Sequence, residues 1–308
     1  MINLDPNFIT GFCDAEGSFV VSIRKKSDYK VGWVVEPIFA IHLHGRDTAL
    51  LHRIKSYFGV GTIRTNKRNG SCLYSVNSKK DIINVIIPHF SNYPLRTQKR
   101  ADFELLNLVL ELMNKKEHQK MEGLRKIMSI KASLNNGLTE VLKKYFPGIV
   151  PLDRPNIQVN PNLNFNWLVG FTEGDGSFGV QIRNYTNKVS LRFTLTQHLR
   201  DIGLMKSFIE KLKCGTLQID SGRFVVYFVV TNLTDITDKL IPLFNKYPLQ
   251  GTKKLDYADF VKIAVLMKNK SHLTAEGLDQ IRQIKTGMNR KRDLTELESK
   301  KNKEKKQS

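Results

Sequence analysis

The feature that most constrains this chain is a stretch of sequence that occurs twice. Residues 8–19 read Phe-Ile-Thr-Gly-Phe-Cys-Asp-Ala-Glu-Gly-Ser-Phe, and residues 167–178 read Trp-Leu-Val-Gly-Phe-Thr-Glu-Gly-Asp-Gly-Ser-Phe. Glu16 and Asp175 lie 159 residues apart, and later matches such as Tyr93 with Tyr247 keep an offset of 154. A long period that is present only twice predicts a pseudo-symmetric pair of domains, because a solenoid needs at least three short repeats.

The repeat also sets the expected domain boundaries. We expect an N-terminal repeat over residues 1–145, a linker over 146–164, a C-terminal repeat over 165–295 and a charged tail over 296–308. The linker is rich in Pro, Gly and Asn and has no hydrophobic periodicity, which is typical of an extended connection. A chain of 308 residues is long enough for two domains that each bury a core.

Hydrophobic periodicity predicts the same order of elements in both repeats. A helix begins at Asp5-Pro6 and is stopped by Gly17. The next residues alternate, with Phe19, Val21 and Ile23 on the buried face of a strand. We expect further strands at 36–43 and 190–197, hairpins at 61–77 and 215–231, and helices at 49–57, 81–90, 100–113, 203–212, 235–244 and 254–267. The predicted fold class is therefore α+β, with two pseudo-symmetric α/β repeats that each carry a mostly antiparallel sheet.

Composition limits the partners. Lys and Arg number 49 against 29 Asp and Glu, which gives a formal net charge of +20 and favours a polyanion as partner. The three cysteines form no CxxC pair, so neither a disulfide framework nor a zinc knuckle is indicated. No apolar run approaches the length of a membrane span and no targeting segment is recognisable, so we expect a soluble protein without a membrane partner.

The opening helix of each repeat ends in an acid. Small residues lie four apart in both helices, Gly11 with Ala15 and Gly170 with Gly174, which favours close contact between the two helices. Such a contact would bring Glu16 and Asp175 together at helix C-termini, where ionised carboxylates are disfavoured unless a divalent cation joins them. Mg²⁺ takes one or two carboxylates together with phosphate oxygens, so the pattern predicts metal-assisted hydrolysis of a phosphodiester. A local cap or salt bridge is the alternative for these two acids.

Asp14 and Glu173 lie two residues before these acids and point elsewhere on the helix. For this second pair we expect structural hydrogen bonds.

These two motifs, each followed by Gly-Ser-Phe and a strand, resemble the signature motifs of single-chain, two-repeat LAGLIDADG homing endonucleases of the kind encoded in fungal organellar introns. The resemblance covers roughly residues 5 to 290. It implies curved sheets that form a DNA-binding saddle, joined at a two-helix interface. It also implies a monomeric, site-specific endonuclease that cuts both strands of a long, near-palindromic DNA target. A mitochondrial location follows from the same resemblance.

The resemblance places the metal site at Glu16 and Asp175, with the preceding residues Ala15 and Gly174. Mg²⁺ is the implied cofactor, with Mn²⁺ able to substitute and Ca²⁺ expected to bind without turnover. Lys99 and Lys253 are the candidates for an accessory catalytic lysine in each repeat. Gln197 fits the place of a polar residue that orders water, and because its counterpart is Leu43, this role is expected in one repeat only.

The exposed faces of the predicted strands carry polar and basic side chains suited to reading base edges in the major groove. The DNA-contacting candidates are Ser22, Arg24, Lys25, Lys26, Ile38, Ala40, His42, Thr62, Arg64, Asn66 and Arg68 in the first repeat, and Gln181, Arg183, Asn184, Tyr185, Ser190, Arg192, Thr194, Thr196, Gln218, Asp220 and Arg223 in the second. A merely solvated polar face is the alternative.

Two other functions stay open at the level of sequence. A DNA-binding protein without catalytic activity could use the same scaffold, although the presence of both acids disfavours it. An intron RNA maturase is the second alternative, because the basic surface could also bind intron RNA.

Overall fold

The computed structural model describes residues 4–66, 68–160, 162–183 and 185–289. Asn184 and the predicted charged tail at 296–308 therefore lie outside the described residues. The chain divides into two compact units, Met1–Phe171 and Thr172–Ser308. The boundary lies within helix α8 (Phe165–Asp175) rather than in the predicted linker, so the domain boundaries drawn from the repeat stay a prediction.

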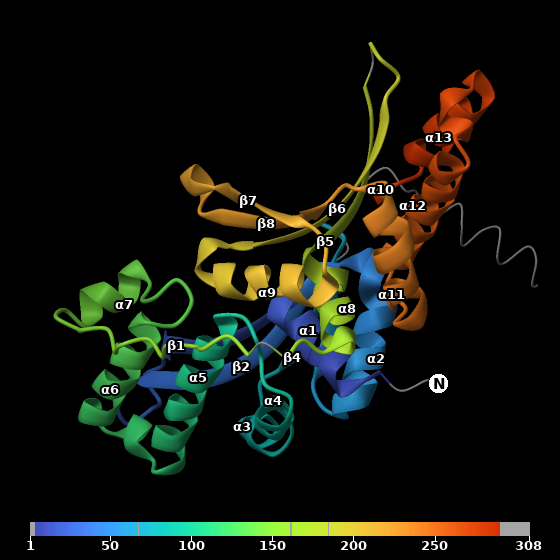
Figure 1. The fold of residues 1–308 in the computed structure, drawn as a ribbon. Coiled ribbons are helices and arrows are strands. Elements are labelled where there is room, and N and C mark those ends of the chain that lie inside the picture. The colour runs from blue at the N-terminus through green and yellow to red at the C-terminus, as the bar shows by residue number, and fades with distance from the viewer. Residues whose placement is uncertain (1–3, 67, 161, 184, 290–308) are drawn as a thin grey trace, which may run out of the picture. The chain divides into compact units, whose positions relative to one another are not determined.

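The first unit begins with a helix, a hairpin and a second helix (Figure 1). Its strands are all antiparallel and lie in the order β1-β2-β4-β3. The elements are α1 (Pro6–Glu16), β1 (Gly17–Lys25), β2 (Trp33–His44), α2 (Thr48–Phe58), β3 (Thr62–Asn66), β4 (Ser71–Val76), α3 (Lys79–Asp81), α4 (Ile87–Asn92), α5 (Lys99–Asn114), α6 (Met121–Ala132) and α7 (Glu140–Tyr145).

Helix α1 begins as the sequence predicts. The Asp5 side chain accepts a hydrogen bond from the backbone N–H of Asn7, and Pro6 occupies the first turn, where its missing N–H costs nothing. The helix ends at Gly17, which is extended and starts β1 without an intervening loop. Glu16 is thereby fixed at the junction between helix and strand.

One face of the first sheet carries the core. Phe19 and Phe39 are fully buried, and their rings contact Phe58 of α2, Phe90 of α4 and Phe103 of α5. The alternation predicted for residues 18–24 is confirmed, because Phe19, Val21 and Ile23 are buried and the residues between them are not. The helices therefore cover one face, and the other face keeps the polar side chains.

The second unit repeats this plan with strand order β5-β6-β8-β7, again all antiparallel. Its elements are β5 (Gly176–Ile182), β6 (Val189–His198), α9 (Ile202–Leu212), β7 (Thr216–Asp220), β8 (Val225–Val230), α10 (Leu233–Asp235), α11 (Ile241–Lys246), α12 (Lys253–Lys268) and α13 (Ala275–Thr286). Phe178 and Phe193 take the places of Phe19 and Phe39 against Phe244 and Phe260. The predicted α+β class with two antiparallel sheets is confirmed.

Two details differ from the sequence prediction. The single short helix expected at 81–90 is interrupted by a π-helical turn, η2 (Ile82–Ile86), and its counterpart by η6 (Ile236–Leu240). Each π turn lies just before a proline, Pro88 or Pro242, whose nitrogen cannot donate the next helical hydrogen bond. Helices α6, α7 and α13 were not among the predicted elements. In α6, the buried residues Leu124, Ile127 and Ile130 are three apart, a spacing typical of one face of a helix.

The segment between α7 and α8 has no helix or strand among its described residues. It is nevertheless held to the first unit. Arg154 donates to the carboxylate of Asp102 at 2.8 Å and to the carbonyls of Ser133 and Gln98. Within the described ranges, no helix has the length and apolar character that crossing a membrane requires.

Candidate functional site

In the first unit, the acid that ends α1 lies beside a lysine that begins α5. Glu16 is the last residue of α1, and Lys99 is the first residue of α5. The Lys99 ammonium donates to the carbonyls of Cys13 and Ala15, both at 3.0 Å. These carbonyls belong to the last turn of α1, where the macrodipole is negative, and the Cys13 oxygen also accepts a hydrogen bond from the backbone N–H of Gly17. Lys99 therefore caps the turn that carries Glu16.

The second unit builds the same arrangement around Asp175. Lys253 begins α12 and donates to the carbonyls of Thr172 and Gly174, both at 2.9 Å, and to that of Gly176 at 2.5 Å. The amide of Gln197 adds a contact to Asp175, because its Nε2 donates to the carboxylate at 2.9 Å. The structure thus brings Asp175, Lys253 and Gln197 together.

The first unit has no amide in the place of Gln197. Leu43 occupies the equivalent strand position and pairs with Cys72 across the sheet. The expected asymmetry of the polar partner between the repeats is therefore present in the side chains.

Asp14 supports the lysine of its repeat rather than joining the acid at the helix end. Its buried carboxylate accepts hydrogen bonds from the backbone N–H groups of Arg96 and Thr97, from the Thr97 hydroxyl at 2.6 Å and from the Trp167 indole at 2.7 Å. Burial raises the pKa of Asp14, and these hydrogen bonds oppose the rise. The Thr97 hydroxyl oxygen in turn accepts from the backbone N–H of Lys99. The structural role expected for Asp14 is confirmed, and Glu173 makes the equivalent contact to the backbone of Gln250.

The small residues of the motif permit close helix contact within the first unit. A Cβ added at Gly11 would lie 1.9 Å from the carbonyl oxygen of Trp167, and one added at Gly170 would lie 2.0 Å from that of Phe8. Any side chain at either position would force the backbones of α1 and α8 apart. The prediction that these two glycines serve a helix contact is confirmed.

The polar face of the first sheet carries the predicted DNA-contacting residues of its strands in rows. His42, Leu73 and Arg64 are paired across β2, β4 and β3, and Ala40 and Thr62 flank Ser75 in the next row. Ser22 and Ile38 point to the same face, and Asn66 ends β3 beside it. Leu73 and Ser75 lie in these rows and were missed, although their alternation in β4 carries the signal.

Three basic candidates of the first repeat have protein partners. Arg24 is paired with Glu36 at 2.5 Å. Lys25 donates to the hydroxyl of Tyr145, and the ammonium of Lys26 lies over the ring of Tyr29. Arg68 lies in the exposed turn after β3.

The polar face of the second sheet is organised in the same way. One row across its strands consists of Thr196, Tyr227 and Gln218. The guanidinium of Arg192 donates a hydrogen bond to the Gln218 side chain at 2.8 Å. Gln181 pairs with Ser190, and Thr194 lies two residues after Arg192 on the same face. Asp220, the last residue of β7, forms an ion pair with Arg223 of the following turn. Tyr227 lies in the row between Thr196 and Gln218 and was not among the predicted residues.

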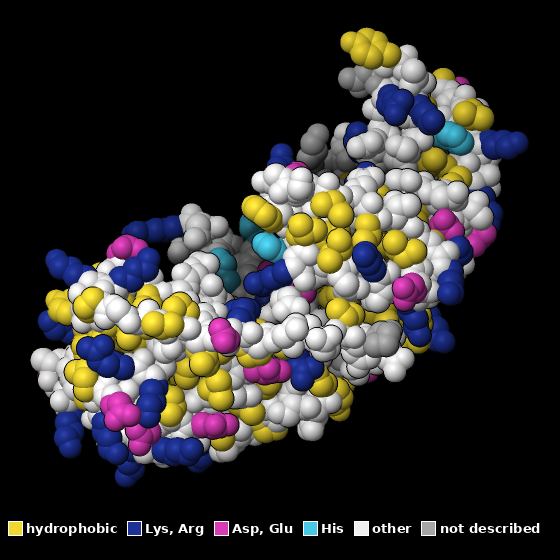
Figure 2. All heavy atoms as spheres, turned by 60° about the vertical axis from the view of Figure 1, so that its left-hand side comes forward, with side chains coloured by type: hydrophobic (Ala, Val, Ile, Leu, Met, Phe, Trp, Pro, Cys, Tyr) yellow, Lys and Arg dark blue, Asp and Glu magenta, His cyan; other side chains and the backbone are white. Residues whose placement is uncertain are grey.

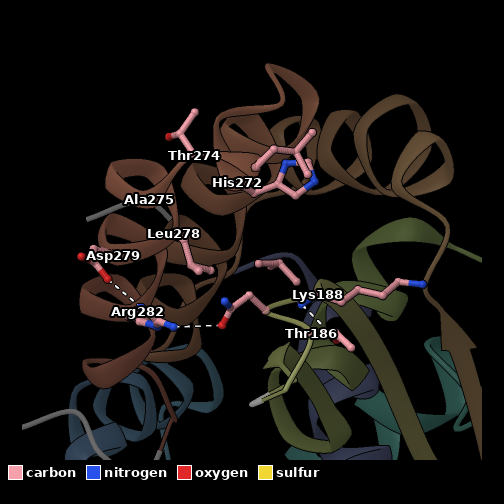
Figure 3. A pocket seen from close by; sticks show the side chains of 11 residues that line it. Thr186, Lys188, His272, Thr274, Ala275, Leu278, Asp279 and Arg282 are labelled. Atoms are coloured by element: carbon pink, nitrogen blue, oxygen red, sulfur yellow. Dashed lines mark hydrogen bonds and ion pairs between the residues drawn. The ribbon is translucent and has the colours of Figure 1, made fainter.

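The loop of the hairpin formed by β5 and β6 lies beside a groove. Arg183 and the fully exposed Tyr185 lie in this loop. Residues of the hairpin, of the turn before α13 and of α13 itself line this groove of about 700 Å³. Figure 3 shows Arg282 of α13 between Asp279 and the hairpin, where its guanidinium donates to Asn187 at 3.1 Å and to Asp279 at 2.8 Å. Arg282 therefore ties the outer end of the hairpin to its own unit.

Basic side chains are the more frequent charged groups on the visible surface. Lys and Arg outnumber Asp and Glu on the face drawn in Figure 2, as the net charge of +20 requires. Such a surface attracts a polyanion through long-range electrostatics.

The donors at the helix ends suit a hard cation. Carboxylate oxygens of Glu16 and Asp175 and helix-terminal carbonyls of Ala15 and Gly174 are ligands of the kind that Mg²⁺ and Ca²⁺ prefer. Among the described residues, no three His, Cys, Asp or Glu side chains gather to hold an ion by themselves. The chemistry of the donor set therefore fits a cation that takes few protein ligands and completes its shell with water and phosphate.

Two antiparallel sheets with polar outer faces, each following a helix that ends in an acid, define a two-repeat α+β protein. The family model described as "LAGLIDADG endonuclease" matches residues 9–110 and 168–264, more than half of the chain. The chain therefore belongs to the LAGLIDADG endonuclease family.

The relatives agree with this assignment. The chain is 40% identical over 296 residues to "Probable intron-encoded endonuclease 2" of Neurospora crassa, which covers 92% of this chain and 65% of that protein. It is 38% identical over 286 residues to "Probable intron-encoded endonuclease 3" of the same fungus, covering 91% and 54%. The chain thus spans between half and two thirds of the length of these curated relatives. Among solved structures, I-SmaMI bound to uncleaved DNA target in the presence of calcium ions is 44% identical, with a TM-score of 0.89 over 92% of this chain and 99% of that one.

Proposed function

We propose that this protein is a site-specific double-stranded DNA endonuclease that hydrolyses one phosphodiester in each strand of a long, near-palindromic target. The observation that carries the proposal is that each unit places one acid, Glu16 or Asp175, at a helix end capped by a lysine. One chain carries two such acids, one for each strand of the DNA, so the protein is proposed to act as a monomer. The structure of I-SmaMI bound to an uncleaved DNA target supports double-stranded DNA as the partner.

Glu16 and Asp175, with the carbonyls of Ala15 and Gly174, are the residues that would hold Mg²⁺, with Mn²⁺ as a substitute. The bound ion supplies charge stabilisation for a phosphate and lowers the pKa of a bound water. The I-SmaMI complex with uncleaved DNA contains calcium ions, which supports Ca²⁺ as an ion that permits binding without turnover.

The lysines bring fixed positive charge to each acid. Lys253 donates three hydrogen bonds, to the carbonyls of Thr172 and Gly174 in α8 and of Gly176 at the start of β5, and an ammonium has three donors. Its proton is therefore held by the backbone, and its role is to offset negative charge beside the phosphate rather than to move a proton. Lys99 has the same position at Glu16. Gln197 holds the Asp175 carboxylate in one orientation, a restraint that Leu43 cannot provide for Glu16.

The polar faces of the two sheets would read the bases. Arg64 and Arg192 carry guanidinium groups, which suit bidentate contact with guanine, and Gln181 and Gln218 carry amides, which suit contact with adenine. The predicted candidates Arg183, Asn184 and Tyr185 would extend the second surface along the β5–β6 loop. Two further relatives are named for introns of ND4 in Podospora anserina and of cox1 in Schizosaccharomyces pombe, which supports the proposed mitochondrial location.

The test is cleavage of a plasmid that carries the target, with Mg²⁺ and without it. Wild-type protein should linearise the plasmid only with Mg²⁺. Glu16→Gln or Asp175→Asn should abolish linearisation and keep DNA affinity, because the sheets are untouched. Glu140→Gln, an exposed acid of α7, is the matched control and should cut normally. Normal metal-dependent linearisation by either site variant would contradict the assignment, and binding without cutting by wild type would favour the non-catalytic alternative.

A further inference from the structure

The turn between β7 and β8 contains a residue in an unfavourable backbone conformation. Phe224 has φ of 55°, in the left-handed region that side chains other than glycine rarely adopt. The equivalent residue of the first repeat is Gly70, with φ of 64°. Both turns are held by the same backbone hydrogen bond, from Leu199 to the Phe224 carbonyl and from Gly45 to the Gly70 carbonyl. One repeat therefore uses the residue that fits this conformation, and the other places a phenylalanine there.

Packing in the core does not explain the phenylalanine at position 224. Its side chain is 61% exposed, so it adds little to the core. The ring lies parallel to the imidazole of His198, with centroids 6.3 Å apart. A Cβ at Gly70 would likewise have room, since its nearest neighbour would be the His44 ring at 3.7 Å. An exposed aromatic ring in a strained turn is a cost to stability, and such costs are retained at functional sites.

The position of the ring points to its use. His198 ends β6 directly after Gln197, whose amide donates to Asp175. His198 pairs with Val225 on the same face as the row of Thr196, Tyr227 and Gln218. Phe224 therefore stands at the same end of the second sheet as Asp175, beside the last residue of β6.

We propose that Phe224, supported by the ring of His198, reads the 5-methyl group of a thymine in the part of the half-site closest to the cleaved bond. In the major groove, the thymine methyl is the apolar feature that separates the A·T pair from the others, and an aromatic ring is a suitable contact for it. Gly70 offers no ring, so the methyl is read in one half-site only. The inference rests on the proposed function, because it assumes that this face binds DNA.

The experiment uses the full chain and a duplex that the wild-type protein selects from a randomised library. Each thymine of the site is replaced in turn by deoxyuridine, which pairs identically but lacks the methyl group. Affinity is measured in Ca²⁺ for wild type, Phe224→Gly and Phe224→Leu. Val265→Ala, which shortens a 51% exposed apolar residue of α12, a helix that packs on the core face of the second sheet, is the control.

Wild type and the control should lose roughly fourfold in affinity at one deoxyuridine near the cleaved bond, the factor expected for one buried methyl group. Phe224→Gly should bind the thymine and deoxyuridine duplexes equally, and Phe224→Leu should keep part of the discrimination. The melting temperature of Phe224→Gly should equal or exceed that of wild type, since glycine fits the turn.

Equal sensitivity of wild type and Phe224→Gly to every deoxyuridine would overturn the proposal, as would a selected site without thymine next to the cleavage position. The proposed function fails in a different way, through absence of any Mg²⁺-dependent cleavage by wild type.

Discussion

His89 makes the stability of the first unit depend on pH. Its side chain lies in α4, is 7% exposed and is held between two hydroxyls. Nε2 is 3.1 Å from the Thr10 hydroxyl, and Nδ1 is 3.1 Å from the Tyr57 hydroxyl. The Thr10 hydroxyl donates to the carbonyl of Tyr93, so it accepts from Nε2, and Nδ1 accepts from Tyr57. The neutral ring is thus fully hydrogen-bonded.

Burial lowers the pKa of His89 to about 4, against about 6.5 in an unfolded chain. Between these values the unfolded state binds a proton and the folded state does not, so the free energy of unfolding falls as the pH falls. The contribution is fully present at pH 7 and is lost progressively from about pH 6.5 down to about pH 4. The difference between the two pKa values corresponds to about 3 kcal/mol.

The assay is urea unfolding at pH 7 and pH 4 for wild type and for His89→Leu, since leucine is the counterpart at position 243. Other titrating groups are common to both proteins, so the difference between their pH dependences isolates His89. Wild type should lose about 3 kcal/mol more than the variant between the two pH values. Identical losses in the two proteins would refute the reasoning that His89 is neutral and buried in the folded state.

Three further outcomes are expected. Gly11→Ala should destabilise the protein by about 1–3 kcal/mol or more in urea unfolding, because its methyl group would lie 1.9 Å from the Trp167 carbonyl; an unchanged midpoint would contradict the contact. Exchange of Mg²⁺ for Ca²⁺ should preserve DNA binding in a gel-shift assay and stop cleavage, and turnover in Ca²⁺ or EDTA would argue against the metal site. In a binding profile over single-base variants of the target, Arg64→Ala and Arg192→Ala should each weaken the preference at one or two base pairs by about 1–3 kcal/mol, on opposite half-sites. Lys305→Ala should change the affinity little and equally for all sequences. A uniform loss of affinity in the arginine variants would mean that these residues contact only phosphate.

The sequence by itself determined what depends on local pattern. The duplicated motif gave two units with the same strand order, and alternation in residues 18–24 separated Phe19 and Val21 from the polar face. The cap at Asp5 and the stop at Gly17 fixed Glu16 at a helix end. These features follow from neighbours within a few residues, whose spacing the chain displays directly.

The tertiary structure decided which distant residues meet. Lys99 could be named as a candidate, but its bond to the Ala15 carbonyl joins residues 84 apart in sequence. The Asp14 contact with Trp167 spans 153 residues, and no periodicity encodes such a distance. Phe224 shows the same limit in a short turn. Its left-handed backbone occurs together with the hydrogen bond from Leu199, and a phenylalanine in the sequence does not predict that conformation. Long-range packing and the backbone angles that it enforces are properties of the folded chain, since they arise only when segments that are independent in sequence share one core.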